Sequence, residues 1–249
     1  YDDRESDIYI VTFMKSGTTW LQVILYNLLT DGNMDFEHIY NVSPWPRNEA
    51  YKNKSAEAIN SLPSPRILKS HDEYDFFNAD TKCKFIHVYR DGKDVAASLY
   101  HHNKNYRDAE LTFQENFEQY FSNEDGAINW FVYNREWFEN KNGFNILYIS
   151  YEQLKNDFDK VIHKIAEFLN AELTDEIIER IKRHASFEYM KENETKFGEV
   201  PPSYTKLVFN QFIRKGTSGE GNSYLNKEQN EFFDEKFKIT ILPFLNKLG

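Results

Sequence analysis

A lysine, a glycine and two threonines occur together in residues 13–20, directly after an apolar run. A turn between a strand and a helix presents free backbone N–H groups, and the helix dipole favours an anion beside them. Lys15 adds a positive charge, and Gly17 allows the backbone to approach a ligand closely. Thr18 and Thr19 add hydroxyl donors. The segment is therefore predicted to bind a phosphate group; the alternative is an ordinary turn with an exposed lysine.

The order of these residues differs from the Walker pattern of ATP-binding and GTP-binding loops. That pattern, G-x-x-x-x-G-K-[ST], needs a glycine where this chain has Ile10 or Val11, and it places glycine directly before lysine. Here the order is Lys15-Ser16-Gly17. Magnesium-dependent ATP or GTP chemistry is therefore only weakly supported, and a nucleotide kinase with an unusual phosphate loop is kept as an alternative.

Lys69 and His71 follow a second strand-like run, residues 66–68. Side chains two residues apart point to the same side of an extended chain, and side chains at the carboxyl end of a parallel strand face the ligand crevice. A cation beside a histidine suits a reaction in which a hydroxyl loses its proton while negative charge develops on a leaving group. The alternative is a histidine of the surface or the core.

Arg90 follows a third run, residues 85–89, and precedes a helical segment. Its guanidinium can offer a planar pair of donors to a phosphate. Ser98 lies about two helical turns further on, so its hydroxyl can join the same site. The alternative is a surface ion pair between Arg90 and Asp91 or Asp94.

Arg214-Lys215-Gly216 places two adjacent cations beside a glycine near the C-terminus. Such a group can hold a second phosphate, although a tripeptide of this kind also occurs by chance. It lies within residues 196–221, which show no clear period. Long irregular segments inside a domain are commonly functional, so these residues are expected to form a lid or cofactor-binding loop.

Strand-like runs alternate with helical ones along the chain and place each of these segments at a strand end. This alternation predicts an α/β fold in which residues 1–249 form a single domain, with a central, mostly parallel sheet flanked by helices and a P-loop-like strand-loop-helix. Ser150-Tyr151-Glu152-Gln153 has the pattern of a capping box at a helix start. The expected strands are residues 8–13, 66–68, 85–89 and 145–149, and the expected helices are residues 18–29, 94–101, 111–121, 128–138 and 158–169.

Composition excludes several classes of protein. The 249 residues include 30 Lys and Arg against 40 Asp and Glu, and this net charge of −10 argues against a protein that coats nucleic acid. Aromatic residues make up 16%, which allows a buried core and excludes disorder. The single cysteine, Cys83, excludes an internal disulfide and is expected to be a structural thiol.

No apolar run reaches the roughly 20 residues of a membrane helix, and the polar N-terminus is unlike a signal peptide, so a cytoplasmic protein is expected.

Taken together, these segments resemble the cytosolic sulfotransferases, which use 3′-phosphoadenosine 5′-phosphosulfate and release adenosine 3′,5′-bisphosphate. The resemblance runs from about Asp7 to Phe237. It rests on five motifs in the order and approximate spacing of the family: Lys15-Ser16-Gly17-Thr18-Thr19-Trp20, Lys69-Ser70-His71, Val88-Tyr89-Arg90-Asp91-Gly92-Lys93-Asp94-Val95, Tyr148-Ile149-Ser150-Tyr151-Glu152 and Ile213-Arg214-Lys215-Gly216.

The resemblance implies a role for each candidate residue and requires no metal. His71 is implied as the general base on the acceptor, and Lys69 as the side chain that stabilises the transferred sulfuryl group. Lys15 is implied to lie near the bridging oxygen of the leaving group. The cofactor-binding set that the resemblance implies comprises Lys15, Ser16, Gly17, Thr18 and Thr19 for the 5′-phosphosulfate, Trp20, Tyr151, Ser186 and Phe187 around the adenine, and Arg90, Ser98, Arg214, Lys215 and Gly216 for the 3′-phosphate.

The chain also departs from the family pattern. Met14 stands where the family has proline, Ala185 where it has threonine, and Glu220 where it has aspartate. The family's C-terminal dimerisation pattern is matched only at Glu231, so a monomer or a different dimer is expected. The family segment that precedes the first strand is largely missing from this sequence.

The sequence therefore predicts a sulfotransferase that acts on a hydroxyl or amine of a small molecule by in-line displacement. No nucleic acid and no membrane span is expected. The alternative outside catalysis is a nucleotide-binding or interaction protein of the same fold, and the presence of both Lys69 and His71 argues against it.

Overall fold

A parallel sheet forms the centre of the computed structural model, which describes residues 1–47, 56–125, 128–198 and 212–248. Within these residues the sheet has four strands in the order β2-β1-β3-β4, with every neighbouring pair parallel. The strands are β1 (Ile8–Thr12), β2 (Ile67–Ser70), β3 (Lys84–Tyr89) and β4 (Asn145–Ser150). The carboxyl ends of parallel strands meet at one edge of a sheet, so the segments that follow them are brought together. The predicted α/β fold with a mostly parallel sheet is confirmed.

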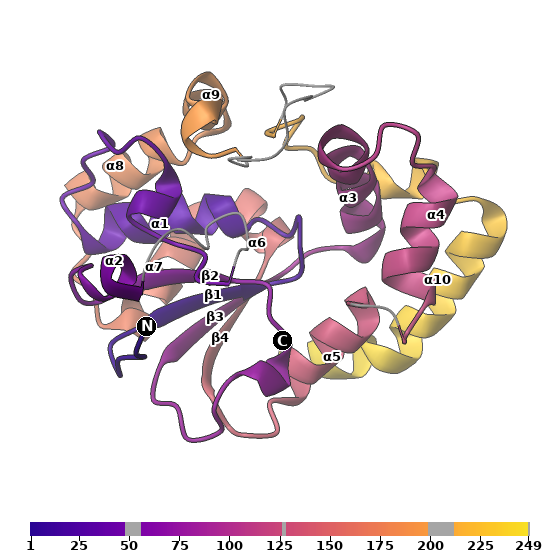
Figure 1. Cartoon of the computed structure of the whole chain (residues 1–249), viewed down its shortest axis with the longest axis horizontal. Coiled ribbons are helices and arrows are strands. Elements are labelled where there is room, and N and C mark those ends of the chain that lie inside the picture. Colours follow the sequence, from indigo (N-terminus) through magenta and orange to yellow (C-terminus); the bar gives the residue numbers. More distant parts are fainter. Residues whose placement is uncertain (48–55, 126–127, 199–211, 249) are drawn as a thin grey trace.

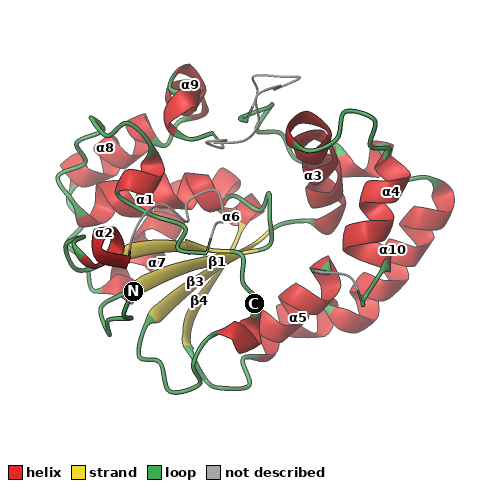
Figure 2. Ribbon diagram, in the orientation of Figure 1, coloured by secondary structure: helices red, strands yellow, loops and turns green. Residues whose placement is uncertain are grey.

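Helices cover both faces of this sheet (Figure 1, Figure 2). None of the helices in the described ranges is long and apolar enough to cross a membrane. The α-helices are α1 (Thr18–Leu29), α2 (Ala56–Asn60), α3 (Gly92–Tyr106), α4 (Phe113–Phe117), α5 (Trp130–Glu139), α6 (Tyr151–Asn156), α7 (Phe158–Leu169), α8 (Asp175–His184), α9 (Phe187–Glu192), α10 (Lys227–Thr240) and α11 (Leu242–Leu248).

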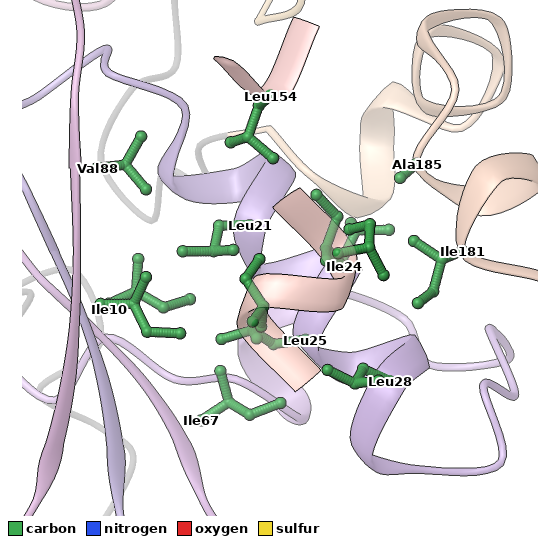
Figure 3. Close-up of a cluster of buried hydrophobic side chains, with 14 of the residues drawn as sticks. Ile10, Leu21, Ile24, Leu25, Leu28, Ile67, Val88, Leu154, Ile181 and Ala185 are labelled. Carbon is green, nitrogen blue, oxygen red and sulfur yellow. The ribbon is translucent and has the colours of Figure 1, made fainter. Parts of the chain in front are cut away.

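Two hydrophobic clusters hold the helices against the sheet. Successive residues of a strand face opposite sides, so Ile8 and Ile10 of β1 enter one cluster while Tyr9 and Val11 enter the other. The first cluster is mostly aliphatic and packs α1, α7 and α8 against the sheet; Figure 3 shows side chains of α1 beside Ile10. The second cluster is rich in aromatic rings and packs α3, α5 and α10 against the other face. Packed helices therefore support both faces of the sheet, including the edge where the carboxyl ends of the strands meet.

The structure agrees with the expected elements in several places and differs in others. Helices α1 and α7 have the predicted bounds, and the predicted capping box at Ser150 begins α6. Helix α3 starts two residues earlier than expected because the Asp91 side chain caps it, accepting from the N–H of Asp94 at 3.0 Å. The predicted helix 111–121 is divided into α4 and a π-helical turn, Glu118–Ser122.

Cys83 is buried directly before β3, as expected for a structural thiol. Its Sγ lies 3.2 Å from the carbonyl oxygen of Arg4. Burial raises the pKa of this thiol, which disfavours the reactive thiolate.

Candidate active site

A cavity of about 540 Å³ opens at the carboxyl-end edge of the sheet. The loop after β1, the end of β2, the segment after β3 and the start of α6 all contribute to its wall. Ser16 is the one sequence-predicted site residue that does not line it. The predicted residues that do are Lys15, Gly17, Thr18, Thr19, Trp20, Lys69, His71, Arg90, Ser98, Tyr151, Ser186, Phe187, Arg214, Lys215 and Gly216.

The loop between β1 and α1 has the backbone shape of an anion cradle. Lys15 and Gly17 both have positive φ, 65° and 102°. A Cβ on Gly17 would lie 2.9 Å from Cδ2 of Tyr151, so only glycine fits without displacing that ring. The Ser16 hydroxyl is buried and, among the described residues, has no hydrogen-bond partner. A buried hydroxyl of this kind beside a helix N-terminus is suited to receive a phosphate or sulfate oxygen.

The His71 imidazole is oriented by the backbone of the neighbouring strand. Its Nδ1 lies 2.7 Å from the carbonyl oxygen of Thr12, the last residue of β1. A carbonyl only accepts, so Nδ1 carries the hydrogen, and in the neutral ring Nε2 holds the lone pair. Trp45 packs edge-on against the ring, with centroids 4.8 Å apart. In its neutral form the ring therefore has its lone pair on Nε2, as a general base requires.

Lys69 lies within β2 rather than after it, because the strand extends to Ser70. Its side chain is buried, and Nζ donates a hydrogen bond to the Tyr40 hydroxyl at 2.7 Å. The ammonium also lies 4.5 Å from the centre of the Trp45 ring. Trp45 thus contacts both Lys69 and His71 and forms the wall behind them. A positive charge held in such a poorly hydrated site acts strongly on a neighbouring anion.

Arg90 joins the phosphate loop to the segment around Arg214. Its Nη1 donates to the carbonyl oxygen of Lys15 at 3.2 Å, and its Nη2 donates to that of Thr217 at 3.1 Å. The guanidinium lies over the Tyr151 ring, 4.4 Å from its centre. The alternative ion pair with Asp94 is present but long, at 3.9 Å. Arg90 is therefore part of the cavity wall and not an isolated surface charge.

The two cations of the C-terminal motif share one carboxylate. Arg214 and Lys215 lie 2.7 and 2.8 Å from the two oxygens of Glu220. Hydrogen bonds from Lys215 and Arg214 lower the pKa of Glu220 to about 2, so the carboxylate stays ionised. A phosphate bound by these cations shares them with Glu220. Residues 199–211 of the expected lid lie outside the described residues.

Aromatic rings form the opposite part of the cavity. Trp20 stacks on Phe158 with centroids 5.9 Å apart, and its indole N–H donates to the carbonyl oxygen of Ala185 at 2.8 Å. Phe187 is 41% exposed, and it lies so close to Gly216 that a Cβ there would approach it to 2.8 Å. Flat, partly exposed rings of this kind can stack on a nucleotide base.

Several lining residues were not predicted from the sequence. Phe212 and Ile213 directly precede Arg214, so the motif itself could have indicated them. His102 follows Ser98 by one helical turn on the same face of α3, which is also a readable signal. The other lining residues lacked any local signal and include Arg107, Lys155, Phe158, Lys182 and Met190.

Comparisons with known proteins agree with the fold and the motifs. The family described as "Sulfotransferase domain" matches residues 5–248. Mouse sulfotransferase 1B1 is 34% identical over 249 residues, which cover 96% of this chain and 83% of that protein. The amine sulfotransferase of rabbit is 31% identical, covering 98% of this chain and 83% of that protein.

Comparison with solved structures also finds sulfotransferases. Mouse sulfotransferase SULT7A1 complexed with PAP superposes with a TM-score of 0.74 at 28% identity, over 97% of this chain and 86% of that one. Retinol dehydratase, in a complex with retinol and PAP, reaches a TM-score of 0.76 at 20% identity over 97% of this chain and 84% of that one, which supports the fold alone. The resemblance seen in the sequence and the expectation of an enzyme are confirmed. The chain belongs to the sulfotransferase family.

Proposed function

We propose that the protein transfers a sulfuryl group from 3′-phosphoadenosine 5′-phosphosulfate to a hydroxyl or amine of a small molecule, with His71 as the general base. The observation that carries the proposal is the orientation of His71. The Thr12 carbonyl accepts from Nδ1, so in the neutral ring the lone pair is on Nε2, and both His71 and Lys69 line the cavity. The name of the rabbit amine sulfotransferase supports including an amine among the acceptor groups.

The residues of the cavity fit this donor. The Ser16 hydroxyl and the backbone at Gly17 suit one anionic group. Positive charge for a second anionic group comes from Arg90, Arg214 and Lys215. The stacked rings at Trp20 can pack against the base. When bound, the donor supplies an activated sulfuryl group.

The protein's own residues then have distinct tasks. Nε2 of His71 accepts the proton of the acceptor group as its oxygen or nitrogen attacks. The ammonium groups of Lys15 and Lys69 offset the negative charge that develops during the transfer. Trp45 and Tyr40 hold Lys69 in place, so this charge needs no rearrangement during the reaction. The rings that line the cavity limit the access of water to it.

His71→Ala is the decisive variant. Removal of a general base should lower the rate of transfer by about 10² to 10⁴. Because His71 is proposed to act on the acceptor, the dissociation constant for adenosine 3′,5′-bisphosphate should stay within about twofold. Turnover is measured with radiolabelled donor against a panel of phenols, alcohols and amines, and binding by calorimetry.

His163→Ala is the matched control, since this histidine is exposed on α7, outside the residues that line the cavity. This variant should change neither the rate of transfer nor the dissociation constant for adenosine 3′,5′-bisphosphate. Retained turnover in His71→Ala would remove His71 from the proposed role. A parent protein that binds the bisphosphate but transfers sulfate to no member of the panel would instead support a non-catalytic nucleotide-binding protein.

A further inference from the structure

The cavity continues along α3 beyond the residues proposed to hold the donor. Ser98, His102 and Arg107 all line it, but only Ser98 belongs to the proposed phosphate site. Helix α3 follows β3 and lies at the upper right in Figure 1, beyond the strands. The residues of this wall that are not proposed to bind the donor are candidates for contact with the other substrate.

Arg107 directly follows the last residue of α3 and lies well away from Ser98, which is proposed to bind the phosphate. The two residues are nine positions apart, which corresponds to about 13 Å along a helix. His102 lies between them. The ring of Phe212 connects this region to the reacting centre, since it lies 4.4 Å from Nζ of Lys15 and 6.2 Å from the His102 ring. The wall from His102 to Arg107 therefore leads away from the transferred group, on the side of the cavity formed by α3.

Arg107 also differs from the other arginines of the cavity in its partners. Arg214 is paired with Glu220, and Arg90 has Asp94 at 3.9 Å. Within the described part of the chain, Arg107 has no carboxylate within 4.0 Å; its Nη1 instead donates to the Tyr120 hydroxyl at 3.1 Å. This single neutral contact orients the guanidinium and leaves most of its donors for a ligand.

The charge of the lining favours an anion at this place. Among the described residues that line the cavity, Glu188 is the only one with a carboxylate. The Asp108 side chain next to Arg107 accepts from the N–H of Glu110 at 2.9 Å, and so caps the local turn instead of pairing with the guanidinium. A planar guanidinium with one edge available matches the geometry of a carboxylate.

We propose that the acceptor carries a carboxylate in addition to the group that is sulfated, and that Arg107 binds this carboxylate. The inference rests on the proposed function for the position of the reacting group. Because Arg107 is exposed, solvent screens this contact, and the affinity that it adds is expected to be modest. The favoured substrates are then small hydroxy or amino acids with an apolar body that lies over the His102 and Phe212 rings.

The test compares two probes that differ only in charge: 3-(4-hydroxyphenyl)propionate and its methyl ester. Their binding to the complex of the full chain with adenosine 3′,5′-bisphosphate is measured by calorimetry, which does not depend on turnover. The carboxylate should bind about tenfold more tightly than the ester, the effect of about one charge-assisted hydrogen bond. Arg107→Gln should reduce this ratio to about one by weakening the carboxylate alone, and Arg107→Lys should retain part of it.

Arg135→Gln is the control, because Arg135 is a surface arginine paired with Glu139 and is not among the residues that line the cavity. It should leave the ratio unchanged. The proposal is overturned if the ester binds as well as the carboxylate, if Arg107→Gln weakens both probes equally, or if neither probe binds. A charge preference that depends on Arg107 without any sulfate transfer would support the binding of a carboxylate by Arg107 and contradict the proposed function.

Discussion

The two side chains proposed to act in the transfer, His71 and Lys69, each contact a neutral oxygen. Thr12 offers a backbone carbonyl to His71, and Tyr40 offers a hydroxyl to Lys69. A carboxylate in either place would offset the positive charge that the reaction needs. Neutral acceptors at these two contacts help to position both side chains and add no negative charge beside them.

Tyr40→Phe tests this arrangement. Loss of the hydroxyl leaves the buried ammonium of Lys69 without that acceptor, so the free energy of unfolding should fall by about 2 kcal/mol. The value of kcat should fall by about tenfold, while affinity for adenosine 3′,5′-bisphosphate stays unchanged. Denaturant titration and steady-state kinetics measure these effects. In the control Tyr26→Phe, which removes an exposed hydroxyl contact to Asn33, both effects should be small; equal losses in the two variants would contradict the role of Tyr40.

At the scale of elements, the site depends on turns that directly follow parallel strands. The loop after β1 and the start of α6 after β4 come into contact, although β1 and β4 are separated in the sheet by β3. Gly17 and Tyr151 are the residues that meet there. Their close approach determines the width of the phosphate loop.

Gly17→Ala should therefore weaken nucleotide binding. Its φ of 102° disfavours any Cβ, and the added methyl would meet Tyr151 at 2.9 Å, so the loop must open. The dissociation constant for adenosine 3′,5′-bisphosphate should rise by at least about tenfold. Gly143→Ala is a matched control, since Gly143 has a φ of 66° but no atom within 4 Å of the added Cβ. It should cost about 1 to 2 kcal/mol of stability and leave nucleotide binding intact; unchanged binding in Gly17→Ala would refute the steric argument.

At the scale of the whole molecule, the aromatic cluster encloses a histidine that the site does not use. His87 of β3 is fully buried, with Trp137 stacked at 5.9 Å and Phe138 edge-on at 5.3 Å. Its Nδ1 lies 3.1 Å from the carbonyl oxygen of Val11. Because the charged ring would lose its hydration there, burial lowers the pKa of His87 to about 4.

This histidine should make the stability of the protein depend on pH. The ring titrates near pH 6.5 in an unfolded chain, so between about pH 6.5 and about pH 4 the unfolded state binds more protons. The free energy of unfolding should then decrease as the pH falls through this range, by roughly 3 kcal/mol from His87. Urea titrations at neutral pH and near pH 4 measure the loss. His87→Leu should reduce it, whereas His163→Gln on the surface should not; the same pH dependence in His87→Leu would assign the effect to other groups.

Much of the site could be predicted because it lies in short segments. Lys15 to Thr19, Lys69 with His71, and Arg90 each directly follow or end an apolar run, and parallel strands bring such positions to one edge. Helices α8, α9, α10 and α11 were not predicted. Helix α8 nevertheless carries readable signals, since Thr174 caps its start and three basic residues lie in its last turn. What local periodicity does not encode is the packing between distant parts of the chain, such as α1 with α8.

The sequence by itself determined the family, the parallel α/β fold and the set of cations and hydroxyls that meet at the sheet edge. These follow from local order: apolar strands, and the charged residues placed directly after them. Only the tertiary structure decided the partners of those residues. The pairing of Arg214 and Lys215 with Glu220, the orientation of His71 by Thr12 and the position of Arg107 on the cavity wall all depend on distances that folding sets. Charge and hydrogen bonding act through space, so the sequence names the groups while the fold selects which of them interact.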